Sequence, residues 1–143
     1  MRRLIPAASI IALSLVAATT AAGATKARCG AGTVRGIAWV TGGAKGVGSL
    51  TGVWTSAAGV FGYRWNCSGG AVSVRKPDTQ PEGFDVRFAG NPGRVAVASA
   101  AGGPAAASVS RNADGSFHVS LAGDTTGQSF KPRSDLAFIV IVF

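Results

Sequence analysis

Short runs of alternating hydrophobic and polar residues make up most of the chain after residue 33, and Gly, Pro, Asn or Asp separate them. A period of two places successive side chains on opposite faces of a β-strand. The spacing of an amphipathic helix does not compete with this pattern. We therefore predict eight strands, at Val34–Val40, Val60–Cys67, Ala71–Arg75, Phe84–Phe88, Val95–Ala100, Ala106–Arg111, Phe117–Leu121 and Leu136–Phe143, with a further strand within Gly42–Trp54.

The alternation also assigns side chains to faces. In the second strand it places Phe61, Tyr63, Trp65 and Cys67 together, which predicts that the aromatic rings and a cysteine share one core. Elsewhere it predicts an inward face and a solvated face on each strand. The inward residues are Phe84, Val86, Phe88, Phe117, Val119 and Leu121, and the outward ones are Asp85, Arg87 and His118.

Two further segments help to define the fold. Asn112-Ala113-Asp114-Gly115 lies between two predicted strands, and Asp-Gly suits the positive φ of a tight hairpin turn. Leu136–Phe143 is apolar throughout, which is typical of a strand in the middle of a sheet with both faces covered. The predicted fold is all-β: an antiparallel β-sandwich or flattened barrel of about eight or nine short strands.

The first 24 residues are typical of a secretion signal. Arg2 and Arg3 precede an apolar run from Leu4 to Val16, and small residues end at Ala24. Cleavage there leaves residues 25–143 as a single secreted domain without a transmembrane segment. The alternative, a retained anchor, needs about twenty apolar residues, and a transmembrane barrel needs strands of about nine to eleven residues. Both are longer than the segments found.

Charge and cysteines fit an extracellular protein. Loss of Arg2 and Arg3 lowers the Lys and Arg count from 14 to 12 against six Asp and Glu, which leaves a net charge of +6. The basic residues are scattered, so no specific nucleic-acid site is predicted, although acidic or glycan polymers at the cell surface are candidate partners. Cys29 and Cys67 are expected to form a disulfide, which closes a loop of about 39 residues and stabilises the fold by about 3–4 kcal/mol.

Candidate chemistry is sparse. His118 is the only histidine, and we expect a passive surface residue, with a small hydrolase as an alternative that needs Ser and Asp within hydrogen-bond reach. The Gly42–Ser49 run lacks the Gly-Lys-Ser/Thr ending of a phosphate-binding loop. No catalytic residue, metal site or cofactor is predicted. Trp39 and Trp54 remain candidate binding residues, because exposed indoles offer flat apolar faces to sugar rings, although core packing is their alternative fate.

Four segments of the chain follow a pattern seen elsewhere: Ala38-Trp39, the runs Tyr63–Gly70 and Gly83–Gly90, and the Ser134–Phe143 ending. In these segments the chain, from about Gly36, resembles an uncharacterised all-β module of secreted bacterial proteins, although the second-half cysteines of many such modules are missing. It implies an extracellular fold without an established activity. The sequence therefore predicts a non-catalytic extracellular interaction or structural module with an unknown ligand, or alternatively a carbohydrate or cell-wall binding module that uses exposed Trp residues.

Overall fold

The computed structural model describes residues 29–30, 32–41, 51–80, 83–91, 93–102, 105–124, 131–133 and 135–143. The predicted signal peptide and the glycine-rich run at 42–49 lie outside these residues. Within the described ranges, no helix is long and apolar enough to cross a bilayer.

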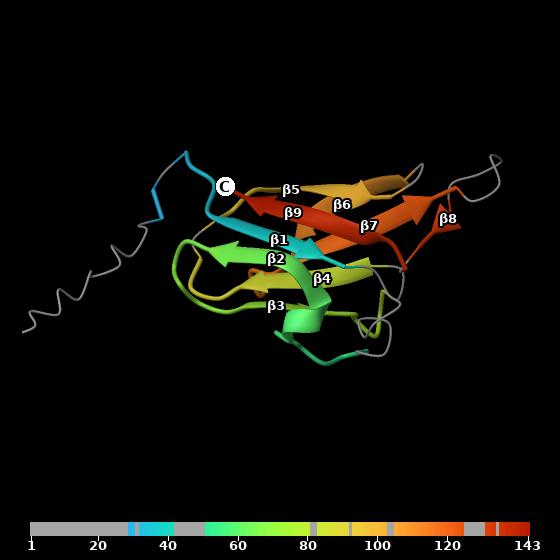
Figure 1. Ribbon diagram of the computed structural model, residues 1–143, viewed down its shortest axis with the longest axis horizontal. Coiled ribbons are helices and arrows are strands. Elements are labelled where there is room, and N and C mark those ends of the chain that lie inside the picture. The colour runs from blue at the N-terminus through green and yellow to red at the C-terminus, as the bar shows by residue number, and fades with distance from the viewer. Residues whose placement is uncertain are drawn as a thin grey trace, which may run out of the picture.

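Two antiparallel sheets pack face to face, which confirms the all-β prediction and selects the sandwich (Figure 1). The first sheet has the strand order β2-β1-β9-β5, and the second has the order β3-β4-β7-β6, with the short β8 also paired to β7. A 3-10 turn, η2 (Ala58–Val60), precedes β2. The strand bounds are β1 Gly36–Val40, β2 Phe61–Asn66, β3 Val72–Arg75, β4 Gly83–Phe88, β5 Ala96–Ala101, β6 Ala105–Arg111, β7 Phe117–Gly123, β8 Lys131–Pro132 and β9 Ala137–Val142.

The core lies between the sheets and consists of Val, Leu, Phe and Ala side chains from both inner faces. Phe84 of the second sheet stacks on Phe138 of the first, with ring centroids 5.3 Å apart. The inward predictions for β4 and β7 are confirmed, since all six residues are buried. The buried core comprises Ala38, Val40, Val60, Phe61, Val72, Val74, Phe84, Val86, Phe88, Phe117, Val119, Leu121, Phe138, Val140 and Val142.

The all-apolar last segment does form a central strand. β9 pairs with β1 on one side and β5 on the other, as Figure 1 shows. Its inward residues are fully buried, whereas Ile139 and Ile141 alternate with them and are only half-buried. The prediction that both faces of this strand are covered is therefore wrong for the described residues, because the outer face of the first sheet is open.

A β-bulge changes the facing of β2. Pairing with β1 is regular from Gly36 to Trp39 and then shifts, so that Trp39 pairs with Tyr63 while Val40 pairs with Phe61. A bulge places an extra residue in one strand and interrupts the alternation there. Phe61 therefore faces the core, whereas Tyr63 is 53% exposed. The predicted common core of aromatic rings and cysteine is wrong in this respect.

The predicted hairpin between β6 and β7 is confirmed. Asn112 and Ser116 close it through a backbone hydrogen bond of 2.8 Å, and Gly115 has a φ of 81°. The further strand expected within Gly42–Trp54 falls mostly outside the described residues. Its end, from Thr51, contributes only a bridge to Lys76, and Thr55 makes another bridge to Val74.

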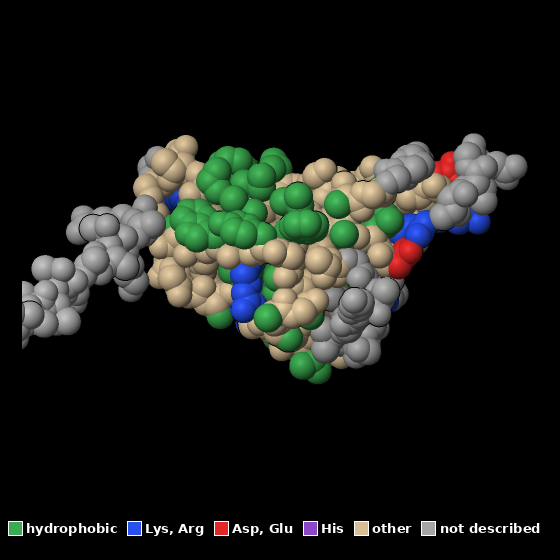
Figure 2. Space-filling model, in the orientation of Figure 1, with side chains coloured by type: hydrophobic (Ala, Val, Ile, Leu, Met, Phe, Trp, Pro, Cys, Tyr) green, Lys and Arg blue, Asp and Glu red, His purple; other side chains and the backbone are tan. Residues whose placement is uncertain are grey.

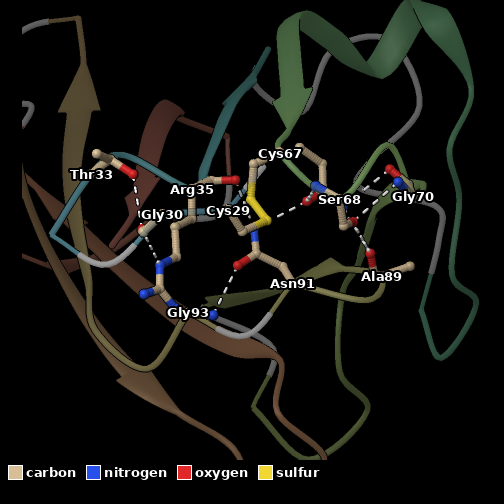
Figure 3. Close-up of a disulfide and its surroundings, with 11 residues drawn as sticks. Cys29, Gly30, Thr33, Arg35, Cys67, Ser68, Gly70, Ala89, Asn91 and Gly93 are labelled. Carbon is tan, nitrogen blue, oxygen red and sulfur yellow. Dashed lines mark hydrogen bonds between the residues drawn. A yellow bond between two sulfur atoms is a disulfide. The ribbon is translucent and has the colours of Figure 1, made fainter. Parts of the chain in front are cut away.

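The disulfide between Cys29 and Cys67 is confirmed, with the two Cα atoms 5.2 Å apart (Figure 3). It fastens the segment before β1 to the end of β2. Beside it, the Cys67 backbone N–H donates to the Arg35 carbonyl at 2.9 Å, and the Asn91 side chain donates to the same oxygen at 2.7 Å. One carbonyl thus joins the strand end, the disulfide and the loop after β4.

Asn66 is the centre of this corner. Its side-chain amide donates to the carbonyls of Gly70 and Ala89 at 3.1 and 2.9 Å, and its oxygen accepts from Asn91 at 3.0 Å. Ser68 adds a 2.6 Å hydrogen bond to the Ala89 carbonyl. Residues 66–70 therefore hold the turn between β2 and β3 against the turn that follows β4, and their role is structural.

Candidate functional surfaces

The outer face of the first sheet carries two rungs of apolar side chains. Strand pairing aligns these side chains across neighbouring strands. All of them point away from the core. We call this surface the apolar platform, and it consists of Trp65, Ile37, Ile141 and Val97 in one rung and of Tyr63, Trp39 and Ile139 in the next, which ends on β5 at the exposed, polar Ser99.

Figure 2 shows hydrophobic side chains gathered over β1, β9 and β5 on the side of the molecule that faces the viewer. Phe143 and Val95, which are 40% and 62% exposed, lie beside each other at the end of the same strands. The residues of the apolar platform include no charged side chain. An apolar face of this kind on a small domain is a binding surface more often than a solvent-facing one.

The indole of Trp39 packs closely against Gly62. A Cβ atom built on Gly62 would come within 2.8 Å of two carbons of the indole ring, so the absence of a side chain there makes room for the ring. Trp39 is nevertheless 42% exposed, so part of its surface is open to solvent. Tyr63, the cross-strand partner of Trp39, is exposed next to it.

The outer face of the second sheet is polar and is organised around a buried carboxylate. Asp85 is 3% exposed. Its Oδ2 accepts from Arg75 at 2.9 Å, and its Oδ1 lies 3.0 Å from both the Asn112 amide nitrogen and His118 Nδ1. Strand pairing places Arg75, Asp85, His118 and Ser110 in one row across β3, β4, β7 and β6.

The expectations for two members of this row need correction. Asp85 and His118 do point away from the core, but they are not solvated, and His118 is only 8% exposed. Both side chains can be buried because they contact each other. A buried carboxylate needs hydrogen-bond donors, and Arg75 and His118 supply them to Asp85. The sequence could not reveal this pairing, because β4 and β7 are separated by two other strands along the chain.

Trp54 belongs to this second face. The guanidinium groups of Arg75 and Arg87 lie over its ring, 4.6 and 4.1 Å from the centroid, and the indole is half-buried. Trp39, in contrast, stands on the outer face of the first sheet. The two candidate residues therefore do not share one surface, as a joint sugar-binding site would require.

Next to His118 the second sheet is hollowed. The hollow is open to solvent and has a volume of about 440 Å³. Its lining consists entirely of uncharged polar residues or histidine: Thr79, Gln80, Ser110, Asn112, His118 and Ser120. Nothing in the sequence indicated it, since its residues come from two strands, β6 and β7, and from the segments that follow β3 and β6.

Metal binding finds no candidate in the described ranges, where no three His, Cys, Asp or Glu residues are grouped closely enough to hold an ion. No protein-family model, curated protein or solved structure matches the chain. The similarity to a secreted bacterial module therefore stays a prediction, and functional arguments rest on the two outer faces of the sandwich.

Proposed function

We propose that this protein is a non-catalytic extracellular binding module and that its apolar platform stacks on the flat faces of sugar rings in a cell-surface polysaccharide. The observation that carries the proposal is the exposed indole of Trp39, which packs against Gly62 beside the exposed Tyr63. Indole and phenol rings bind the apolar face of a flat ligand while their polar edges stay wet. The disulfide supports an oxidising, extracellular location.

The size of the platform favours a polymer chain over a folded partner. Strands lie about 4.8 Å apart and rise about 3.4 Å per residue, so a face of four strands and a few residues covers roughly 400 Å². A stable protein interface buries about 800 Å² on each partner. A second copy of this chain would therefore need additional contacts, whereas a few consecutive sugar rings fit the area available.

Charge on the platform also favours a neutral ligand surface. Its seven residues are apolar or aromatic. Binding to it should accordingly survive salt that screens the attraction between a protein of positive net charge and an acidic polymer, since the Debye length falls to about 3 Å at 1 M. Salt dependence thus separates stacking from non-specific electrostatic adsorption.

The polar row supports a structural role better than a catalytic one. A serine hydrolase needs its histidine hydrogen-bonded to the nucleophile and its aspartate available to stabilise the imidazolium. Here Arg75 already neutralises Asp85 at 2.9 Å. Ser110 is the cross-strand neighbour of His118, but no hydrogen bond joins their side chains within the described region. We therefore retain the non-catalytic proposal over the hydrolase alternative.

Binding to insoluble polysaccharide tests the proposal. The purified protein is mixed with cellulose, chitin and isolated bacterial cell walls at low and high salt, and the bound fraction is measured by sedimentation. We expect at least one solid to retain the protein at 1 M salt, and Trp39→Ala to weaken that retention at least tenfold. Trp54→Ala is the matched control, because Trp54 lies on the opposite sheet, and it should change retention less than threefold.

Gly62→Ala tests the geometry without removing the indole. The added methyl group would collide with the Trp39 ring, so the ring must tilt and the platform loses flatness. We expect a loss of binding close to that of Trp39→Ala. Equal retention by the native protein, Trp39→Ala and Gly62→Ala would contradict the proposal, as would loss of all binding at high salt.

A further inference from the structure

The hollow on the second sheet suggests a second ligand site, separate from the platform. We infer that it binds a single neutral sugar unit through hydrogen bonds from fixed side chains. This inference deepens the proposed function and rests on it for the choice of ligand class. It concerns the opposite face of the sandwich from Trp39, so the two sites are tested independently.

The size and chemistry of the hollow match such a ligand. A volume of about 440 Å³ lies within the range of about 300–1,000 Å³ usual for small-molecule sites. Every lining side chain is a hydroxyl, an amide or the imidazole. Hydroxyls and amides donate and accept hydrogen bonds in the way that sugar hydroxyls do. The lining contains neither the apolar walls of a lipid site nor the cations of a phosphate site.

Two lining groups have fixed orientations. Asn112 donates both amide hydrogens within the protein, to Asp85 at 3.0 Å and to Ser116 Oγ at 2.9 Å, so its carbonyl oxygen is the group left for a ligand. His118 Nδ1 lies 3.0 Å from Asp85 Oδ1, which fixes the orientation of the ring and leaves Nε2 as its second hydrogen-bonding nitrogen. The site therefore presents two positioned polar groups to ligand hydroxyl groups, which both donate and accept.

Preorganisation explains why the buried ionic row is useful. Asp85, which is paired with Arg75, holds Asn112 and His118 in place before a ligand arrives. Binding therefore does not have to immobilise these side chains, which lowers its entropy cost. Gly83 contributes space, because a Cβ atom at this position would lie 2.5 Å from the Nε2 and Cε1 atoms of His118. The imidazole occupies the room that a side chain on β4 would otherwise fill.

Nuclear magnetic resonance with soluble sugars tests the inference. The ¹⁵N-labelled protein is titrated with glucose, galactose and N-acetylglucosamine, and shifts of the His118 ring and the Asn112 amide are followed. We expect one sugar to shift both groups with a dissociation constant in the millimolar range. Ser110→Leu, which places an isobutyl group at the hollow, should weaken this binding at least tenfold.

Three further proteins make the outcome decisive. Ser108→Leu changes an exposed serine on the same strand outside the lining, and it should leave the affinity within twofold. The double variant Ser110→Ala/Ser120→Ala removes two hydroxyl groups without added bulk and should weaken binding several-fold, which guards against misfolding of Ser110→Leu. Trp39→Ala should retain the sugar-induced shifts, even though it loses retention on polysaccharide.

The inference is overturned if none of the three sugars shifts His118 or Asn112. It is equally overturned if the shifts persist unchanged in Ser110→Leu, or if they vanish in Trp39→Ala. Failure of the proposed function looks different, because the native protein would then not be retained on any insoluble polysaccharide at high salt.

Discussion

Replacing Asp85 with alanine should be among the most destabilising single changes in this domain. The carboxylate is 3% exposed and accepts hydrogen bonds from Arg75, Asn112 and His118. Its removal leaves three donors without their acceptor in a buried or half-buried setting. Arg75 regains part of its hydration, since its side chain is 30% exposed, whereas His118 has little access to water.

The magnitude follows from these contacts. An orphaned buried donor costs about 1–3 kcal/mol, and breaking a buried ion pair by removing one partner costs about 3–5 kcal/mol. We expect a loss of about 4 kcal/mol in the free energy of unfolding, which is a large part of the roughly 5–15 kcal/mol typical of a domain. Asp85→Asn keeps the shape and one acceptor oxygen, so it should cost about half as much.

Urea denaturation followed by tryptophan fluorescence measures the effect. The midpoint should fall for Asp85→Ala while the dependence on urea stays unchanged, as for a mutation that alters stability alone. Asp135→Ala is the control, because Asp135 pairs with Arg133 at the surface with 58% of its side chain exposed, and such pairs contribute at most about 1 kcal/mol. Equal midpoints for the two alanine variants would refute the proposed role of the buried row.

Three other changes have defined outcomes. Replacing both bridged cysteines with serine should lower the free energy of unfolding by about 3–4 kcal/mol, measured by urea denaturation of oxidised and variant protein. Gly70→Ala should cost about 2 kcal/mol, because its Cβ would lie 2.2 Å from the Ala89 carbonyl oxygen, whereas Gly59→Ala, with no atom within 4 Å, should change the urea midpoint little. Hydrogen bonds from Ser116, with a smaller contribution from Arg87, lower the pKa of Asp114 from 3.8 to about 2. Since a lowered pKa stabilises the folded state above 3.8 and this contribution disappears as the pH falls through 2, the stability difference between native protein and Asp114→Asn should shrink over that interval in an acid titration.

Local features of the fold were predictable from the sequence. Eight strands, the β6–β7 hairpin and the disulfide follow from alternation, turn residues and cysteine count, and the structure confirms them. The strands and the hairpin are determined by neighbouring residues, whereas the disulfide joins residues 38 positions apart and was predicted from the cysteine count. The two-residue β8 was not predicted, because its pairing partner rather than its own sequence defines it as a strand.

Features that depend on register were not predictable. Because of the bulge opposite Trp39, Phe61 and Tyr63 lie on opposite faces of the sheet instead of on one face. The single glycine between them, Gly62, does not reveal the bulge in the sequence. The pairing of Asp85 with His118 depends on β4 lying next to β7. Both corrections come from strand order and alignment, which hydrophobic periodicity does not specify.

Both candidate surfaces share this dependence on strand order. The apolar platform exists because β1, which carries Trp39, lies between β2 and β9. Its aromatic side chains and Ile37 come from the paired strands β1 and β2, whereas Ile139 and Ile141 come from β9, about 100 residues further along the chain. The sequence singled out Trp39 as a candidate but offered no reason to separate it from Trp54, and the structure places the two residues on opposite sheets.

The position of β9 also determines which part of the first sheet is available for binding. A central strand has both edges hydrogen-bonded, so β9 cannot recruit another strand, and among the described strands β2 and β5 lie at the edges of this sheet. Pairing of another strand at an edge of the sheet would not bury Ile139 or Ile141. Both lie in the middle of the outer face, where a polar side chain would make the protein more soluble. Contact with a ligand that lies on the outer face of the sheet would explain apolar residues at these positions. The positions of Ile139 and Ile141 therefore support the proposed ligand, which lies flat over several strands, over a partner strand added at an edge.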